Sequence, residues 1–201
     1  DGKTLRGTIP AGQSRGVHLL AAFVPDAGLV LMQMEVDGKE NEVRAAPRVL
    51  HCLDLRGKVV TGDAMHAQRS LSVQIVAAGG DYVWTVKDNQ PELKEAITTL
   101  FEPTHSIPGT SAVRTDVRTA RTIEKQHGRI EERTLKASSD LTGYLDWPAV
   151  RQVFTLERRF TRVVDGKIMH ETVCGVTSLS ADVASAQQLL AYVRRHWQIE
   201  N

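Results

Sequence analysis

Three acidic residues stand where a fold could bring their carboxylates together. Asp1 opens the chain, Asp63 comes directly after a short apolar strand pattern, and Glu200 falls on the last helical pattern. Carboxylates on neighbouring strand ends and on a covering helix could hold a pair of Mg²⁺ ions, which prefer oxygen ligands and keep water positions open for substrate phosphates. Taken alone, each acid is more typical of a solvated strand or helix end, so the hypothesis depends on the elements that carry them.

The first half of the chain alternates between strand and helix patterns. Residues 17–23 and 29–36 have β-type composition and are joined by the turn sequence Pro25-Asp26-Ala27-Gly28, so they predict a hairpin. Asn41 is suited to be the N-cap of a helix that Pro47 should kink or delay. Further along, the patterns predict a strand at 58–61, a helix at 67–78, a strand at 82–86 and a helix at 91–100.

These elements predict an α/β fold with an inserted region. Because a helix connects them, the strands at 58–61 and 82–86 should be parallel neighbours in a sheet covered by helices, and active sites of such sheets lie at the carboxyl ends of strands, where Asp63 stands. Long strand patterns then follow, with a hairpin turn at Asp165-Gly166, and indicate a β-rich insertion rather than a continuation of the layered sheet. We expect residues 1–101 to form the first part of a core, 102–180 the insertion, and 181–201 a final core helix that carries Glu200.

The composition is that of a soluble globular protein. With 201 residues, of which 41% are hydrophobic, the chain can bury a core, which excludes a peptide hormone, a disulfide knot and a disordered tail. Lys plus Arg number 25 against 24 Asp plus Glu, so any basic surface must be local. No apolar stretch approaches the roughly 20 residues of a membrane span. Cys52 and Cys174 lack metal-like spacing, which indicates a reducing cytosol.

Six ordered blocks of sequence resemble one family along essentially the whole chain. The blocks are Asp1-Gly-Lys-Thr-Leu-Arg-Gly, Lys39-Glu-Asn-Glu, Val60-Thr-Gly-Asp-Ala-Met-His-Ala-Gln, Tyr82-Val-Trp-Thr-Val-Lys-Asp-Asn-Gln-Pro, His127-Gly-Arg-Ile-Glu and Arg195-His-Trp-Gln-Ile-Glu-Asn. Together they closely resemble the ISAs1 family of bacterial insertion-sequence transposases, which is related to the IS4 group. The resemblance implies an RNase H-like mixed sheet flanked by helices, with a β-rich insertion before the last helix, and a DDE triad formed by Asp1, Asp63 and Glu200 as catalytic and metal-binding residues.

The resemblance also implies an activity and its partners. Such an enzyme cuts and joins DNA at the ends of its own mobile element by two-metal phosphoryl transfer, with two Mg²⁺ ions that Mn²⁺ can replace. We therefore expect double-stranded DNA as partner (element ends and target), a homodimer in a synaptic complex, no membrane partner, and a cytoplasmic, nucleoid-associated location. Family members carry a segment ahead of the first Asp, and both ends of this chain look cut. An RNase H-like nuclease without strand transfer and a non-catalytic DNA-binding remnant of a transposase remain alternatives.

Several polar residues could contact the DNA. A turn at Lys87, Asn89 and Gln90 lies between a strand and a helix N-terminus, where exposed amides and a Lys favour a phosphate, although a solvated turn is equally consistent. Residues 111–136 hold seven basic against four acidic residues and could track a DNA backbone or form a solvated strand face. The predicted DNA-binding residues are Lys3, Arg6, Lys87, Asn89, Gln90, Arg129, Arg195 and His196.

Other conspicuous side chains favour structural roles. The IS4 group has Tyr and Arg ahead of its last acid, where this chain has Val193 and His196. His66 and His127 have no partner at metal-ligand spacing and are expected to be polar loop residues. Trp84 and Trp147 are expected in the core, whereas Trp197, close to Glu200, is the best candidate for a base-stacking side chain.

Overall fold

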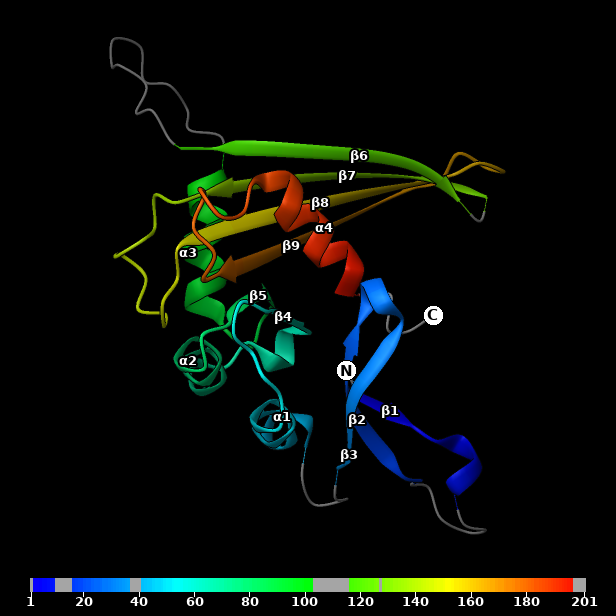
Figure 1. Cartoon of the computed structure of the whole chain (residues 1–201). Helices are drawn as coiled ribbons and strands as arrows, with labels where there is room; N and C mark the ends of the chain where they lie inside the picture. Colours follow the sequence, from blue (N-terminus) through cyan, green and yellow to red (C-terminus); the bar gives the residue numbers. More distant parts are fainter. Residues whose placement is uncertain (1, 10–15, 37–40, 103–115, 127, 197–201) are drawn as a thin grey trace.

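The computed structural model describes residues 2–9, 16–36, 41–102, 116–126 and 128–196 of the chain (Figure 1). Their strands form two sheets, one of three strands in the order β1-β2-β3 and one of six strands in the order β4-β5-β9-β8-β7-β6. Helices cover both faces of the larger sheet. The mixed α/β architecture predicted from the sequence is therefore present.

The smaller sheet is an antiparallel meander. β1 (Gly2–Thr4) pairs with the first residues of β2 (His18–Val24), and β2 pairs along its length with β3 (Leu29–Glu35). The predicted turn is a 3₁₀ turn, Pro25–Ala27, closed by Gly28 in the left-handed region at φ 60°. The pairing of β2 with β3 confirms the predicted hairpin. It forms because proline and glycine supply the two backbone conformations that this turn requires.

The larger sheet combines a parallel pair with an antiparallel array. β4 (Val59–Gly62) and β5 (Asp81–Val86) are parallel and are connected through α2 (Arg69–Ala77), as predicted. β9 (Ile168–Thr177) then pairs antiparallel with β5, and the remaining strands follow as β8 (Gln152–Arg162), β7 (Arg129–Ser138) and β6 (Arg118–Gln126).

The β-rich region does precede the last helix, but the expectation that it stands apart from the layered sheet was wrong. Val83 to Val86 of β5 are in register with Thr177 to Cys174 of β9, so the inserted strands extend the same sheet. Alternating side chains mark a segment as a strand, but they do not identify its partner.

Two apolar cores lie on opposite faces of the larger sheet. Trp84 and Val153 point into the core shared with α1 (Glu42–His51), α2 and α3 (Pro91–Phe101). Their strand neighbours Val83 and Phe154 point into the second core, against α4 (Ala186–His196). Trp84 and Trp147 are buried, as expected. The alternation of side chains along β5 and β8 therefore places three helices on one face and α4 on the other.

Two helix boundaries differ from expectation. α1 begins at Glu42, directly after the N-cap Asn41, and continues through Pro47, so the proline does not delay it. α4 begins at Ala186 rather than at residue 181, because Ser185 and Gln188 exchange hydrogen bonds in a capping box. In the part of the chain that the structure describes, no helix has the length and apolar character of a membrane span.

Candidate active site around Asp63

Asp63 stands at the carboxyl end of β4, as the sequence predicted. Its backbone is extended (φ −60°, ψ 163°) and begins a short 3₁₀ turn, Ala64–His66, which we call the Asp63 turn. The preceding Gly62 allows the strand to pass a buried ring, because a Cβ at this position would lie 2.8 Å from Trp84 Cζ3. The Asp63 side chain is 39% exposed, so its carboxylate is within reach of solvent and of a ligand.

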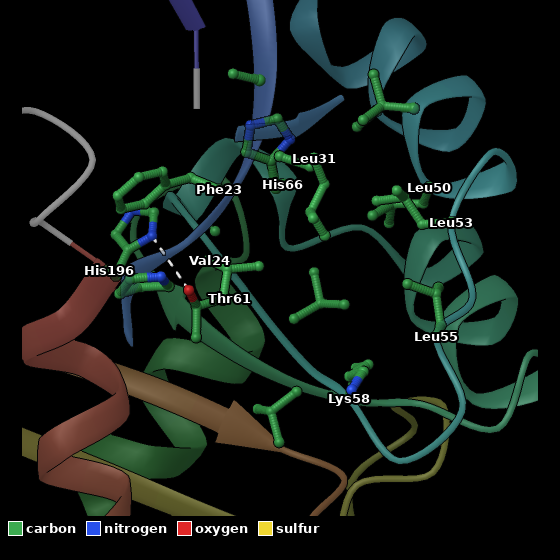
Figure 2. Close-up of a pocket in the computed structure, with 18 of the residues that line it drawn as sticks. Phe23, Val24, Leu31, Leu50, Leu53, Leu55, Lys58, Thr61, His66 and His196 are labelled. Carbon is green, nitrogen blue, oxygen red and sulfur yellow. Dashed lines mark hydrogen bonds between the residues drawn. The ribbon is translucent and has the colours of Figure 1, made fainter. Parts of the chain in front are cut away.

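The C-terminal end of α4 meets this carboxylate. His196 Nε2 donates to Asp63 Oδ1 at 3.2 Å, and His196 Nδ1 lies 3.4 Å from Thr61 Oγ1 of β4, the contact drawn in Figure 2. The hydrogen bond from His196 lowers the pKa of Asp63, partial burial opposes the effect, and the positive field of Lys87 adds to the lowering. Asp63 is therefore an ionised carboxylate at neutral pH.

The loop after β5 holds the Asp63 turn from its other side. Asn89 Nδ2 donates to the carbonyl oxygen of Ala64 at 2.8 Å, and Gln90 Nε2 donates to that of Ala67 at 3.1 Å. The sequence predicts that both amides contact DNA, and in the structure their NH₂ groups hold the backbone of the turn and of the residue that follows it. Sequence patterns missed this role, because both acceptors are backbone atoms of a distant loop.

A second carboxylate lies next to the turn. Glu42, the first residue of α1, places Oε1 2.9 Å from His18 Nε2 and Oε2 3.6 Å from His66 Nε2. The His66 side chain is buried within the Asp63 turn, and burial lowers its pKa. No sequence pattern assigns a role to Glu42, although it belongs to one of the six blocks. The sequence predicts His66 to be a polar loop residue; it does lie in a short turn, but it is buried there, whereas its neighbour Met65 is exposed.

An apolar cavity of about 440 Å³ opens beside these residues, between β2, α1 and β4. Figure 2 shows Leu50 and Leu53 on the α1 side of the cavity, Leu31 of β3 in the middle of the view, and the rings of His66 and His196 away from the two α1-side leucines. Gly62 and His66, on either side of Asp63 in the chain, line the cavity, so its apolar surface adjoins the Asp63 turn.

The other predicted site residues are distributed over the molecule. Asp1 and Glu200 lie outside the described residues, as do His127 and Trp197, so the triad as a whole stays a prediction. Among the residues that are described, no three His, Cys, Asp or Glu side chains are grouped so that they could hold a metal ion. Asp63 by itself supplies the oxygen chemistry that Mg²⁺ prefers, and it is ionised and accessible.

Most of the described basic residues near 118–136 pair with acids. Arg118 pairs with Asp116, Arg121 with Glu132, Arg133 with Glu124 and Lys136 with Glu157. This pattern favours a solvated strand face over a surface that tracks a DNA backbone.

The predicted DNA contacts have different surroundings. Lys3 and Lys87 are exposed, and Arg6 lies in the 3₁₀ turn Arg6–Thr8. The Arg129 guanidinium stacks 5.1 Å from the ring centre of Phe160, and Arg195 pairs with Asp26 at 2.9 Å.

Comparisons with known proteins identify the family. Residues 1–201 match the family model described as "Transposase DDE domain". The chain is 36% identical over 185 residues to an uncharacterized protein in the dhlA 3' region of Xanthobacter autotrophicus (90% of this chain, 60% of that protein). It is 31% identical over 213 residues to the H repeat-associated putative transposase YhhI of Escherichia coli K12 (100% of this chain, 53% of that protein). The chain thus spans little more than half the length of these relatives.

A solved structure supports the fold. A piggyBac transposase, determined as a synaptic complex with hairpin DNA, superposes with a TM-score of 0.50 at 12% identity, covering 100% of this chain and 38% of that one. This likeness confirms the expected RNase H-like fold, and the match along the whole chain shows that the protein belongs to the transposase DDE domain family.

Proposed function

We propose that this chain is the catalytic region of a DNA transposase of the ISAs1 type, which cleaves and joins DNA at the ends of an insertion sequence. The observation that carries the proposal is the accessible, ionised carboxylate of Asp63 at the carboxyl end of β4, in a chain that matches the transposase DDE domain from end to end. Asp1 and Glu200 complete the proposed acidic triad.

The described neighbours of both other acids support this assignment. Gly2, which follows Asp1, packs against Glu42, and Glu42 in turn contacts the Asp63 turn. His196, four residues before Glu200, donates to Asp63 itself. Two segments far apart in the sequence therefore approach the Asp63 turn, one through Glu42 and His66 and the other through the Asp63 carboxylate itself.

Two divalent ions, Mg²⁺ or Mn²⁺, fit the chemistry of the proposed acids. When bound, such a pair activates the attacking water or 3′ hydroxyl and stabilises the leaving oxygen. The task of Asp63 is to offer ionised oxygens, and the lowered pKa keeps it in that form. Lys87 adds positive charge near Asp63, where a substrate phosphate would lie.

Double-stranded DNA is the proposed partner, and a homodimer pairing two element ends is the proposed assembly at the nucleoid in the cytoplasm. Lys3, Arg6, Lys87, Arg129, Arg195 and His196 remain proposed DNA contacts, and Asn89 and Gln90 now have an additional task in holding the Asp63 turn. The division into core residues 1–101, insertion 102–180 and final helix 181–201 also stays a prediction.

The decisive test uses the full-length protein that contains this chain. Asp63→Asn should abolish Mg²⁺-dependent cleavage of an element end while DNA binding in a mobility-shift assay stays near the wild-type level. Asp54→Asn, on an exposed loop, serves as the control. Cleavage by Asp63→Asn at the wild-type rate would overturn the assignment.

Two further measurements separate the alternatives. Joining of a 3′-hydroxyl end to a target plasmid identifies a transposase, whereas cleavage without joining identifies a nuclease. Calorimetry that finds no Mg²⁺ or Mn²⁺ site in the wild-type protein identifies a non-catalytic remnant.

A further inference from the structure

Glu42 is a largely buried carboxylate at a junction between the two sheets. Its side chain is only 17% exposed, and it lies at the start of α1, where the helix dipole favours a negative charge. Neither the sequence patterns nor the proposed triad gives this residue a task.

On one side, Glu42 is fitted to β1. A Cβ built on Gly2 would lie 2.2 Å from Glu42 Oε1 and 2.6 Å from Oε2, so the absence of a side chain at position 2 creates the space for this carboxylate. His18 adds a second connection, since its Nε2 lies 2.9 Å from Glu42 Oε1 and its Nδ1 lies 2.8 Å from Thr4 Oγ1. Both ends of β1 are thus tied to Glu42.

On the other side, Glu42 contacts the Asp63 turn through His66. The distance from Glu42 Oε2 to His66 Nε2 is 3.6 Å, and the His66 side chain is 7% exposed. The backbone N–H of His66 donates to the carbonyl oxygen of Asp63 at 2.8 Å, and its side chain packs over Gly62. A shift of the His66 ring would therefore move the backbone that carries Asp63.

We propose that Glu42 is a positioning residue, which fixes the strand that follows Asp1 relative to the turn that carries Asp63. The inference rests on the proposed function, because it assumes that these two acids bind the same metal ions. Glu42 acts through Gly2, His18 and His66 and does not itself contact the reacting groups.

The chain offers matched controls for both sides of this contact. Glu92 occupies the first turn of α3 as Glu42 does that of α1, but it is exposed. Gly7 has no atom within 4 Å of its built Cβ, in contrast to Gly2. Loss of a helix-terminal charge and loss of a glycine can therefore be separated from loss of the junction.

The experiment measures Mn²⁺ binding to the full-length protein, from the electron paramagnetic resonance signal of free Mn²⁺, together with the Mn²⁺ concentration for half-maximal cleavage. Residues that position metal ligands without binding the metal typically contribute about 10- to 100-fold to metal affinity. We expect a loss of Mn²⁺ affinity of that order for Glu42→Ala and for Gly2→Ala. The double variant Gly2→Ala/Glu42→Ala should bind Mn²⁺ as well as Glu42→Ala alone, because without the Glu42 carboxylate a Cβ at position 2 has nothing to displace. Glu92→Ala and Gly7→Ala should bind like the wild type.

Each failure has a distinct signature. Equal losses in Glu42→Ala and Glu92→Ala, or additive losses in the double variant, would overturn the positioning role while wild-type Mn²⁺ binding through Asp63 upholds the proposed function. Absence of a Mn²⁺ site in the wild type would overturn both. If Glu42→Ala does not fold, Glu42→Gln replaces it, and unchanged Mn²⁺ affinity in both Glu42→Gln and Gly2→Ala would refute the inference.

Discussion

The contact between His196 and Asp63 yields a quantitative prediction. A hydrogen bond to a charged group contributes about 1.5–3 kcal/mol when shielded from water, but the Asp63 side chain is 39% exposed, so solvent screening reduces its share to about 0.5–1 kcal/mol. We expect a coupling free energy of this size between His196→Ala and Asp63→Asn in a double-mutant cycle at pH 7. In a chain of this length, each 1 kcal/mol corresponds to about 2–4 °C in Tm.

The pH dependence of this coupling has a fixed sign. Because the folded-state pKa of Asp63 is lowered, its contribution to stability is present above the unfolded value near 3.8 and is lost as pH falls through the folded pKa. His196→Ala removes the hydrogen bond that lowers the pKa of Asp63, while partial burial still raises it, so the pKa of Asp63 should rise.

Urea denaturation of the four proteins of the cycle, between pH 7 and pH 3, measures the coupling, and NMR titration of the Asp63 carboxyl carbon measures its pKa. A coupling indistinguishable from zero at pH 7, or a pKa of Asp63 that falls in His196→Ala, would refute the assigned cause. Thr142→Ala serves as a control. It removes a hydroxyl that donates to the backbone carbonyl oxygen of Arg151, and it should leave the pKa of Asp63 unchanged.

Two further predictions concern the support of the site. Asn89→Ala removes the donor to the Ala64 carbonyl and should cost about 1 kcal/mol of stability and reduce cleavage more than DNA binding; a loss of DNA affinity with stability unchanged would instead favour a phosphate contact. Glu131→Ala leaves two arginines without the 9%-exposed carboxylate that they share, and it should lower the free energy of unfolding, measured by urea denaturation, by about 3 kcal/mol. Lys136→Ala, which removes one partner of an exposed ion pair, should lower it by less than about 0.5 kcal/mol. Equal losses in the two variants would contradict the role of burial.

Some features of the fold escaped prediction because they depend on pairing across the sheet. β6 has the sequence Arg-Thr-Ala-Arg-Thr-Ile-Glu-Lys-Gln and looks like a solvated segment. Its charges become compatible with a sheet only when β7 supplies partners, such as Glu132 for Arg121 and Arg133 for Glu124. The attachment of β9 to β5 likewise has no local signal.

The site, like the fold, has features that the sequence predicts and features that only the structure shows. The sequence by itself determined the β2–β3 hairpin, the N-cap at Asn41 and the place of Asp63 after a strand, because turn chemistry, capping and side-chain alternation act between residues near one another in the chain. Only the tertiary structure decided that His196 meets Asp63, that Asn89 and Gln90 hold its turn, and that Glu42 lies between His18 and His66. These contacts join segments that are far apart in sequence, and their partners are selected by packing of the whole sheet and its helices, which no local pattern encodes.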